Sequence, residues 1–230
     1  MERKKGILAL QSLIPYLNKK FLYHLMWQVK ATDLKKNNEL FNELDKKYNE
    51  MLELAKSIIK AEYLYQAFYI QRYENNFIIC HDTGEIGVST GKYEKKNLLD
   101  AFPKIIEDKD TIFFQIVTIG KKAVDKATEL KNNGYYSEYF YWHGFCATLT
   151  ETLADYVNNI IKIELKKYFF NDVVDTKRFS FGYQALPNLS EQEKIVQLLK
   201  SDLIGVEMIE QSMLYPEYTT CALVLPYVCK

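Results

Sequence analysis

The sequence is short of glycine, proline and arginine. Only 9 of its 230 residues are glycine and 5 are proline, which disfavours collagen-like, low-complexity and glycine-rich nucleotide-loop proteins. It contains neither a G-x-G-x-x-G nor a Walker motif, so no Rossmann or P-loop nucleotide site is indicated. The arginines are Arg3, Arg72 and Arg178, among 30 basic residues. Each of the three therefore requires a structural explanation.

A net charge and a long apolar run are also lacking. The 30 Lys and Arg residues balance 30 Asp and Glu residues, so no overall field favours nucleic acid or an anionic membrane. No apolar run reaches the roughly 18 residues that a membrane-spanning helix needs. The apolar stretch 7–14 is short and lacks a small-residue cleavage site, which is not typical of a signal peptide. We expect a cytoplasmic protein with no membrane or nucleic-acid partner.

The cysteines form no C-x-x-C pair. They are Cys80, Cys146, Cys221 and Cys229, and their wide spacing favours reduced thiols over a disulfide framework. His143 lies three residues before Cys146 on a predicted helix, and this spacing could place two metal ligands together. Cys80 and His81 could supply two more ligands, but adjacent residues on a strand point to opposite faces, so these two cannot easily bind one metal. No orienting acid is visible for a Cys–His nucleophile pair. We expect neither a metal site nor a catalytic residue.

What is present is typical of a globular protein with a substantial core. Hydrophobic residues make up 48 % and charged residues 26 % of the chain, and there are 18 Tyr and 13 Phe. Apolar spacing and capping signals predict helices over 18–30, 34–60, 95–106, 121–130, 135–170 and 190–199. In the longest of them, Phe145, Leu149, Leu153, Tyr156, Ile160 and Ile163 form one stripe.

Runs of aromatic and β-branched residues predict strands over 63–73, 77–80, 111–119, 206–209 and 219–225. Helices and strands do not alternate regularly, which favours the α+β class over a doubly wound sheet. We expect an N-terminal helical segment over 1–60 and an α+β body over 61–230, together forming one compact domain.

The most informative segment is 177–188. Arg178 is followed by an extended stretch, by Gly182 and by Tyr183. Arginine is suited to bidentate capture of a carboxylate or phosphate, and glycine allows a ligand to approach the backbone closely. The pattern fits a small-molecule binding loop, and it equally fits an ordinary loop with a surface arginine.

Segment 177–188 resembles the R-x-x-x-G-Y-P-x-C-P-D signature of the activation (reactivation) domain of cobalamin-dependent methionine synthase. Three further likenesses follow the family's order. Residues 147–156 resemble its acidic helix, 197–199 with 204–206 resemble its leucine pair and I-G-V/M turn, and 208–216 resemble its L-T-E-S…M-x-P stretch. The likeness is strongest over 135–225.

Several positions depart from the family pattern. Gln184, Leu186 and Asn188 replace its usual Pro, Cys and Asp, and Gln211 replaces its Ser. The family's N-terminal ligand-binding Asp has no convincing match, and the chain stops at Lys230, where the family continues. These departures imply either weaker ligand binding or a site that a partner completes.

The resemblance implies a fold and a function. The fold is a twisted, mostly antiparallel sheet with flanking helices. The family domain binds S-adenosylmethionine and presents it to cob(II)alamin on the synthase, and an electron from flavodoxin or a similar reductant permits reductive methylation. A stand-alone chain of this kind would be an accessory subunit without turnover of its own.

The same resemblance assigns binding roles to individual residues. Arg178 would pair with the methionyl carboxylate, and Glu151 would meet the amino or sulfonium cation. The backbone over 179–182 and Tyr183 would line the groove. The expected S-adenosylmethionine-binding residues are Glu151, Arg178, Phe179, Ser180, Gly182 and Tyr183, with Glu210 and Tyr215 as additional candidates.

Two alternatives stay open at this stage. One is an adaptor for another corrinoid methyltransferase. The other is an interaction protein that retains the fold but no longer binds the ligand, in which Glu151 lies on a solvated helix face. An independent methyltransferase is disfavoured because no base that would activate an acceptor is evident.

Overall fold

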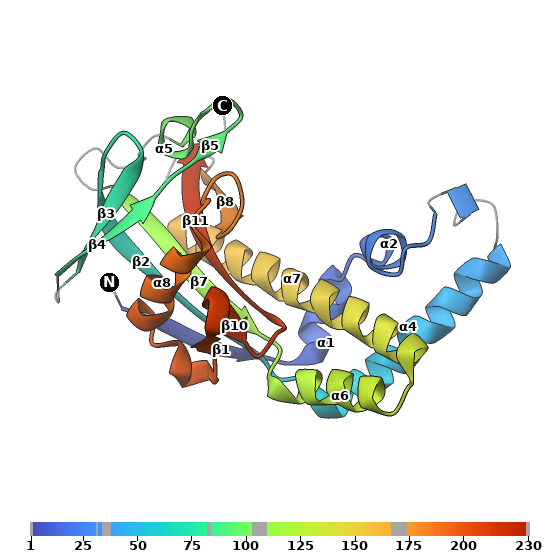
Figure 1. The fold of residues 1–230 in the computed structure, drawn as a ribbon. Coiled ribbons are helices and arrows are strands. Elements are labelled where there is room, and N and C mark those ends of the chain that lie inside the picture. The colour runs from blue at the N-terminus through green and yellow to red at the C-terminus, as the bar shows by residue number, and fades with distance from the viewer. Residues whose placement is uncertain are drawn as a thin grey trace.

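The fold is built on one antiparallel sheet. The computed structural model describes residues 2–30, 32–33, 38–81, 84–102, 110–166 and 174–228. Seven strands form the sheet in the order β4-β3-β2-β7-β11-β8, with β1 also paired to β2, and every pairing is antiparallel (Figure 1). These strands are β1 (Lys4–Leu8), β2 (Ala61–Arg72), β3 (Asn76–His81), β4 (Gly84–Ser89), β7 (Thr111–Thr118), β8 (Val174–Ser180) and β11 (Thr219–Val228). The expected α+β class and antiparallel sheet are confirmed.

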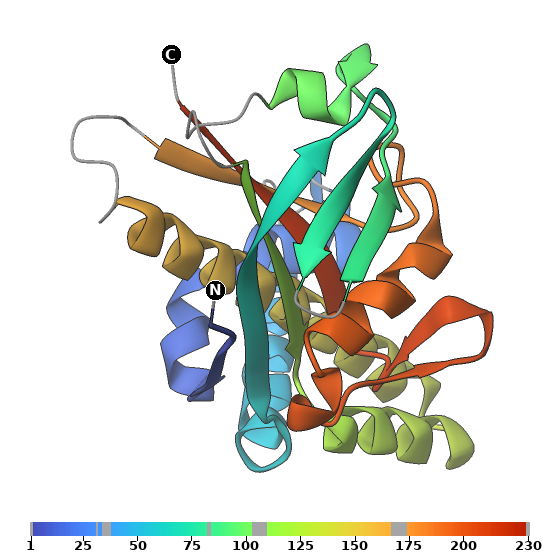
Figure 2. The same ribbon diagram turned by 90° about the vertical axis from the view of Figure 1, so that its left-hand side faces the viewer.

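Helices cover both faces of this sheet. They are α1 (Leu10–Leu13), α2 (Lys19–Phe21), α4 (Asn38–Ile58), α5 (Leu98–Ala101), α6 (Lys121–Asn132), α7 (Tyr136–Lys166) and α8 (Gln192–Leu198). One hydrophobic cluster joins α1, α4, α6 and α7 to the sheet, and a second joins α5 and α8 to it from the other side. Figures 1 and 2 show α7 crossing the sheet on the face opposite to α8. The two layers place α7 directly against β8.

The long helix α7 buries a different stripe from the expected one towards its end. Phe145, Leu149 and Leu153 are fully buried, whereas Ile163 is 61 % exposed. At about 100° per residue the expected stripe keeps nearly one direction along the helix, whereas the buried positions follow each other in steps of four residues, about 40° beyond a full turn each time, so the face that packs on the core rotates along α7. Val157 and Ile161 occupy that face instead.

Three strands of the sheet, β1, β4 and β8, were not among those expected from the sequence. Strand β1 is a short edge strand with mostly exposed side chains, and β4 contains two glycines, which strands normally avoid. Both exist because they pair along their whole length with β2 and β3.

Two helix starts differ from the predictions. The helix expected from residue 190 begins as α8 only at Gln192, and Oδ1 of Asn188 accepts a hydrogen bond from the Ser190 amide at 3.2 Å. The expected helix over 95–106 is reduced to α5, which Asn97 caps. Residues 103–109 lie outside the described part.

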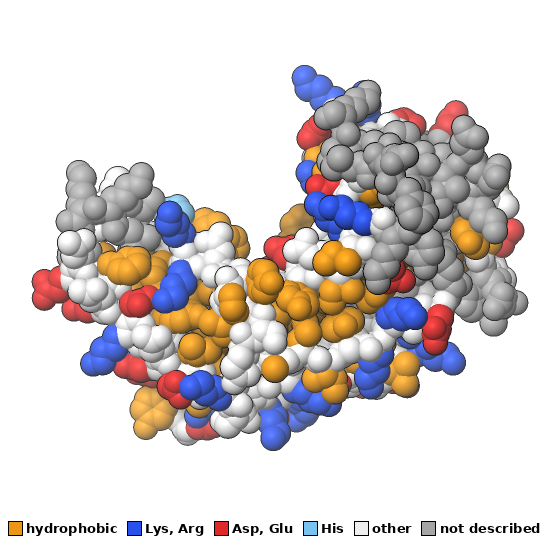
Figure 3. Space-filling view, turned by 180° about the vertical axis from the view of Figure 1, so that it is seen from behind, with side chains coloured by type: hydrophobic (Ala, Val, Ile, Leu, Met, Phe, Trp, Pro, Cys, Tyr) orange, Lys and Arg blue, Asp and Glu red, His pale blue; other side chains and the backbone are white. Residues whose placement is uncertain are grey.

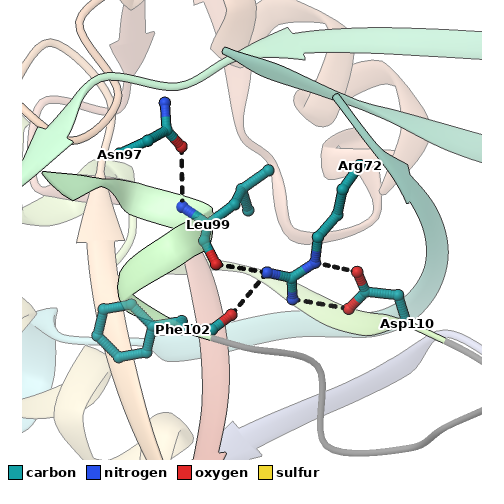
Figure 4. Close-up of polar contacts among 5 residues, drawn as sticks. All are labelled: Arg72, Asn97, Leu99, Phe102 and Asp110. Atoms are coloured by element: carbon teal, nitrogen blue, oxygen red, sulfur yellow. Dashed lines mark hydrogen bonds and ion pairs between the residues drawn. The ribbon is translucent and has the colours of Figure 1, made fainter. Parts of the chain in front are cut away.

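Arg72 holds α5 in place (Figure 4). Its Nε and Nη2 pair with both carboxylate oxygens of Asp110, and its Nη1 donates to the carbonyls of Leu99 and Phe102 at 2.6 Å each. The Asp110 side chain is only 8 % exposed. The guanidinium therefore ties the end of β2, the end of α5 and the start of β7 together.

The N-terminal segment shares the core of the rest of the chain. Leu13 and Leu22 belong to the same buried cluster as Phe145 of α7. Asn18 caps α2, as expected, by accepting the Phe21 amide at 3.0 Å. A π-helical turn, η2 (Leu22–Met26), follows α2. The division at residue 60 stays a prediction.

Candidate functional site

The candidate site is the contact between β8 and α7. Arg178 lies on β8 opposite Val224 of β11, and its side chain faces α7. Its Nη2 donates to Oε2 of Glu151 at 2.5 Å and to Oδ1 of Asp155 at 3.3 Å. The two acids are one helical turn apart, so both project towards the same guanidinium. The structure thus brings together two residues that the sequence singled out separately.

The donors of Arg178 are only partly used. The side chain is 15 % exposed, whereas Glu151 and Asp155 are 49 % and 70 % exposed. Among the described residues, only Nη2 makes hydrogen bonds. A guanidinium has five N–H donors in a planar arrangement that matches a carboxylate. Nε and Nη1 of Arg178 therefore offer recognition capacity that the described fold does not use.

Glu151 lies where three cavities meet, which we call together the α7 groove. The first has a volume of about 590 Å³ and is also lined by Ser180, Tyr183 and Tyr215. The second, of about 400 Å³, reaches Asn18. The third, of about 330 Å³, adjoins His143. Arg178 itself lines none of them, so Glu151 and Asp155 stand between the guanidinium and the groove.

The surface of the molecule agrees with a binding face. Figure 3 shows hydrophobic side chains gathered across the middle of the face seen from behind. In Figure 1, α7 runs between the end that carries α2 and the sheet. The residues that line the α7 groove come from segments that are far apart in the sequence.

The loop after β8 is shaped by two glycines. Gly182 has φ of +83° and its amide donates to the Leu186 carbonyl at 2.8 Å, a conformation that favours glycine. A Cβ on Gly91 would lie 2.0 Å from the carbonyl oxygen of Gln184. The segment around residue 91 can therefore pack against this loop only because residue 91 is glycine. The loop presents Tyr183, which is 71 % exposed, at the first cavity.

The other expected site residues have distinct places. Ser180 and Tyr215 line the first cavity. Phe179 points to the opposite face of the sheet, where its ring packs against Phe102 and Tyr93. Glu210 is exposed at the turn between β9 (Glu207–Ile209) and β10 (Met213–Tyr215) and lines none of the three cavities. Ligand contact by these residues stays a prediction.

Several groove residues were missed from the sequence. Phe21 lines the second and third cavities, and Asn18 lines the second. No local signal links them to α7, because the π-helical turn η2 and the core packing bring them there. Asp155 could have been identified as a second acid, since it follows Glu151 by four residues. Gln192 also lines the first cavity, where its side-chain amide donates to the Ser212 carbonyl at 2.5 Å.

The His and Cys pairs considered as metal ligands do not assemble. Within the described residues, no group of three or more His, Cys, Asp or Glu side chains could hold a metal ion. His143 Nδ1 lies 3.1 Å from the Tyr218 hydroxyl and 3.8 Å from Glu217. Burial raises the pKa of the Cys146 thiol well above its usual range. Cys80, Cys146 and Cys221 are free thiols, and Cys229 lies outside the described residues.

The family model for the activation domain of vitamin B12-dependent methionine synthase matches residues 9–227. The chain belongs to this family. Two methionine synthases, from Mycobacterium tuberculosis (strain ATCC 25618 / H37Rv) and Mycobacterium leprae (strain TN), are 36 % and 35 % identical to the chain over 131 residues. The matched region is 50 % of this activation domain and 11 % of each synthase.

A solved structure shows the same fold. A crystal structure of the MetH reactivation domain bound to AdoHcy superposes with a TM-score of 0.78. The match covers 98 % of this activation domain and 78 % of that chain, at 15 % sequence identity. Among the described helices, none combines the length and apolarity that crossing a bilayer requires.

Proposed function

We propose that this activation domain binds S-adenosylmethionine in the α7 groove. It would serve the reductive methylation of cob(II)alamin on a cobalamin-dependent methionine synthase. The observation that carries the proposal is the arrangement of Arg178: a largely buried guanidinium with unused donors, paired with Glu151, which lines all three cavities, and with Asp155, which lines the second. The AdoHcy bound to the structurally similar domain supports a ligand of this chemical class.

The ligand carboxylate would exchange places with the acids on Arg178. A carboxylate and a guanidinium form charge-assisted hydrogen bonds of about 2.7–2.9 Å, and two such bonds give bidentate recognition. Glu151 would then turn to the ammonium group of the ligand. The positive and negative groups of the zwitterion are thus matched by groups that already pair in the ligand-free chain.

The adenosine group of the ligand would occupy the first cavity, which meets the second cavity, lined by Asp155, at Glu151. The volume of the first cavity, about 590 Å³, lies within the range of roughly 300–1,000 Å³ that small-molecule sites span. Tyr183 and Tyr215 border it with aromatic surface, and Ser180 adds a hydroxyl. These are side chains that can contact the adenosine group by stacking and hydrogen bonding.

The reacting centre would belong to the partner. The partner would hold cobalamin, which, with one electron from flavodoxin or a similar donor, would supply the nucleophile for the sulfonium methyl group, and S-adenosylhomocysteine would remain in the groove of this chain. The residues of this chain hold and orient the ligand, and no nucleophile of its own is required. A related corrinoid protein is an alternative partner of the same chemistry.

Titration calorimetry on the wild type and on Arg178→Ala tests the proposal. Loss of a charge-assisted contact should cost about 1.5–3 kcal/mol, or roughly 10- to 150-fold in affinity. Lys177→Ala is a matched control, because it removes the same charge from the neighbouring position of β8, where Lys177 contacts Tyr93 on the other face. Absence of binding by the folded wild type, or an equal loss in both variants, would contradict the proposal.

A further inference from the structure

Arg178 forms ion pairs with two carboxylates, although a single carboxylate would balance its positive charge. Asp155 Oδ1 lies 3.3 Å from the same Nη2 that Glu151 contacts at 2.5 Å. Asp155 also lines the second cavity together with Glu151. It is 70 % exposed, so it is not required to balance a buried charge. Asp155 is therefore a second anion beside Arg178, at the edge of the groove.

The charges of the site and of the ligand can be counted against each other. The site offers one cation, Arg178, and two anions, Glu151 and Asp155. S-adenosylmethionine has one carboxylate and two cations, its ammonium and its sulfonium. S-adenosylhomocysteine has the same carboxylate and ammonium but a neutral thioether. Once the ligand carboxylate takes Arg178, both acids are released, and only the sulfonium ligand has a cation for each.

We propose that Asp155 is a specificity determinant that makes the groove prefer the sulfonium ligand to the neutral thioether. The inference rests on the proposed function, because it assumes that the ligand carboxylate binds Arg178. Glu151 serves either ligand through the common ammonium. Asp155 has a counterpart only while the methyl group is still on sulfur. Loss of the methyl group therefore weakens binding, which favours release of the product.

Other charged groups near the groove are placed differently. Glu217 lines the first and third cavities, but it lies beside His143, 3.8 Å from Nδ1, and has no contact with Arg178. Asp175 lies three residues before Arg178 on β8, and Lys162 of α7 pairs with it at 2.8 Å. Among the described residues, Glu151 and Asp155 are the carboxylates paired with Arg178.

The test compares two ligands on one variant. In Asp155→Asn, the affinity ratio of S-adenosylmethionine to S-adenosylhomocysteine should fall about two- to fivefold, the size expected for an exposed charge pair. The fall should come from weaker S-adenosylmethionine binding and should shrink at high salt. Sinefungin, in which an amine-bearing carbon replaces the sulfonium, keeps the second cation and should behave like S-adenosylmethionine.

Glu138→Gln is the matched control, because it removes one exposed acid from the first turn of the same helix. At about 1.5 Å per residue it lies roughly 25 Å from Asp155, beyond the screening length of physiological salt. The control should leave the ratio unchanged. Thermal melting of both variants should match the wild type, since both acids are exposed.

The outcomes separate the two proposals. If the folded wild type binds neither ligand, the proposed function fails and this inference fails with it. If the wild type binds both and Asp155→Asn changes both affinities equally, the inference alone is wrong. If Glu217→Gln lowers the ratio as much as Asp155→Asn does, discrimination belongs to the general field of the groove, and the assignment to Asp155 is overturned.

Discussion

Arg72 and Arg178 are both paired with acids, yet they serve opposite purposes. Arg72 uses Nε, Nη1 and Nη2, with a bidentate partner and two backbone carbonyls. Arg178 uses only Nη2 within the described structure, and its partners are exposed. A guanidinium that bonds through all three of its nitrogens fixes the fold, whereas one that bonds through a single nitrogen beside a cavity is available to a ligand.

The difference teaches how to interpret an ion pair without a bound ligand. Asp110 is almost fully buried and would be left as an uncompensated charge if Arg72 were removed. Glu151 and Asp155 are hydrated and can separate from Arg178 at little cost. Burial of the acidic partner, rather than the length of the contact, therefore distinguishes the structural pair from the exchangeable one.

The largest expected effect is that of Arg72→Ala. Removing one partner of a buried, hydrogen-bonded pair costs about 3–5 kcal/mol, and this should appear as a lower free energy of unfolding in denaturant titration. Arg178→Ala should cost less than about 1 kcal/mol in the same assay. Equal destabilisation by the two substitutions would break the distinction between the two arginines.

Gly91→Ala should have an intermediate effect. Its Cβ would lie 2.0 Å from the Gln184 carbonyl oxygen, so the loop that presents Tyr183 would have to move. Overpacking of this kind costs about 1–3 kcal/mol, and it should also weaken S-adenosylmethionine binding. Gly87→Ala is a control in β4, where an added Cβ would meet nothing within 4 Å. Unchanged stability and binding in Gly91→Ala would show that the loop adjusts freely.

The smallest expected effect is on the loss of folding stability at low pH. Hydrogen bonds from Lys19 at 2.6 Å and from Tyr23 at 2.8 Å lower the pKa of Asp45. Because the pKa of Asp45 is lower in the folded than in the unfolded state, its carboxylate stabilises the fold at pH values above the unfolded-state pKa of about 3.9. This stabilisation is lost as the pH falls below that value towards the folded-state pKa. Asp45→Asn should therefore lose less stability than the wild type between pH 5 and pH 3, measured by thermal melting. A parallel loss would exclude this contribution.

Much of the fold could be predicted from local patterns, and the site could be predicted only in part. The amphipathic stretch 34–60 predicted α4, and the apolar run 111–119 predicted β7, because both bury a regular face. Strands β1 and β4 had no such face and depend on their partners. The sequence drew attention to Arg178 and Glu151 separately. The contact between Arg178 and Glu151 results from packing between distant segments. The same packing places Asn18 and Phe21 in the cavities that Glu151 lines.

A structure of the complex with S-adenosylmethionine would show directly whether Arg178 binds the ligand carboxylate. The account predicts ligand carboxylate oxygens about 2.7–2.9 Å from nitrogen atoms of Arg178, with Glu151 turned from Arg178 towards the ligand ammonium. The Arg72–Asp110 pair should be unchanged. A ligand that occupies the groove while Glu151 and Asp155 both remain on Arg178 would contradict the account.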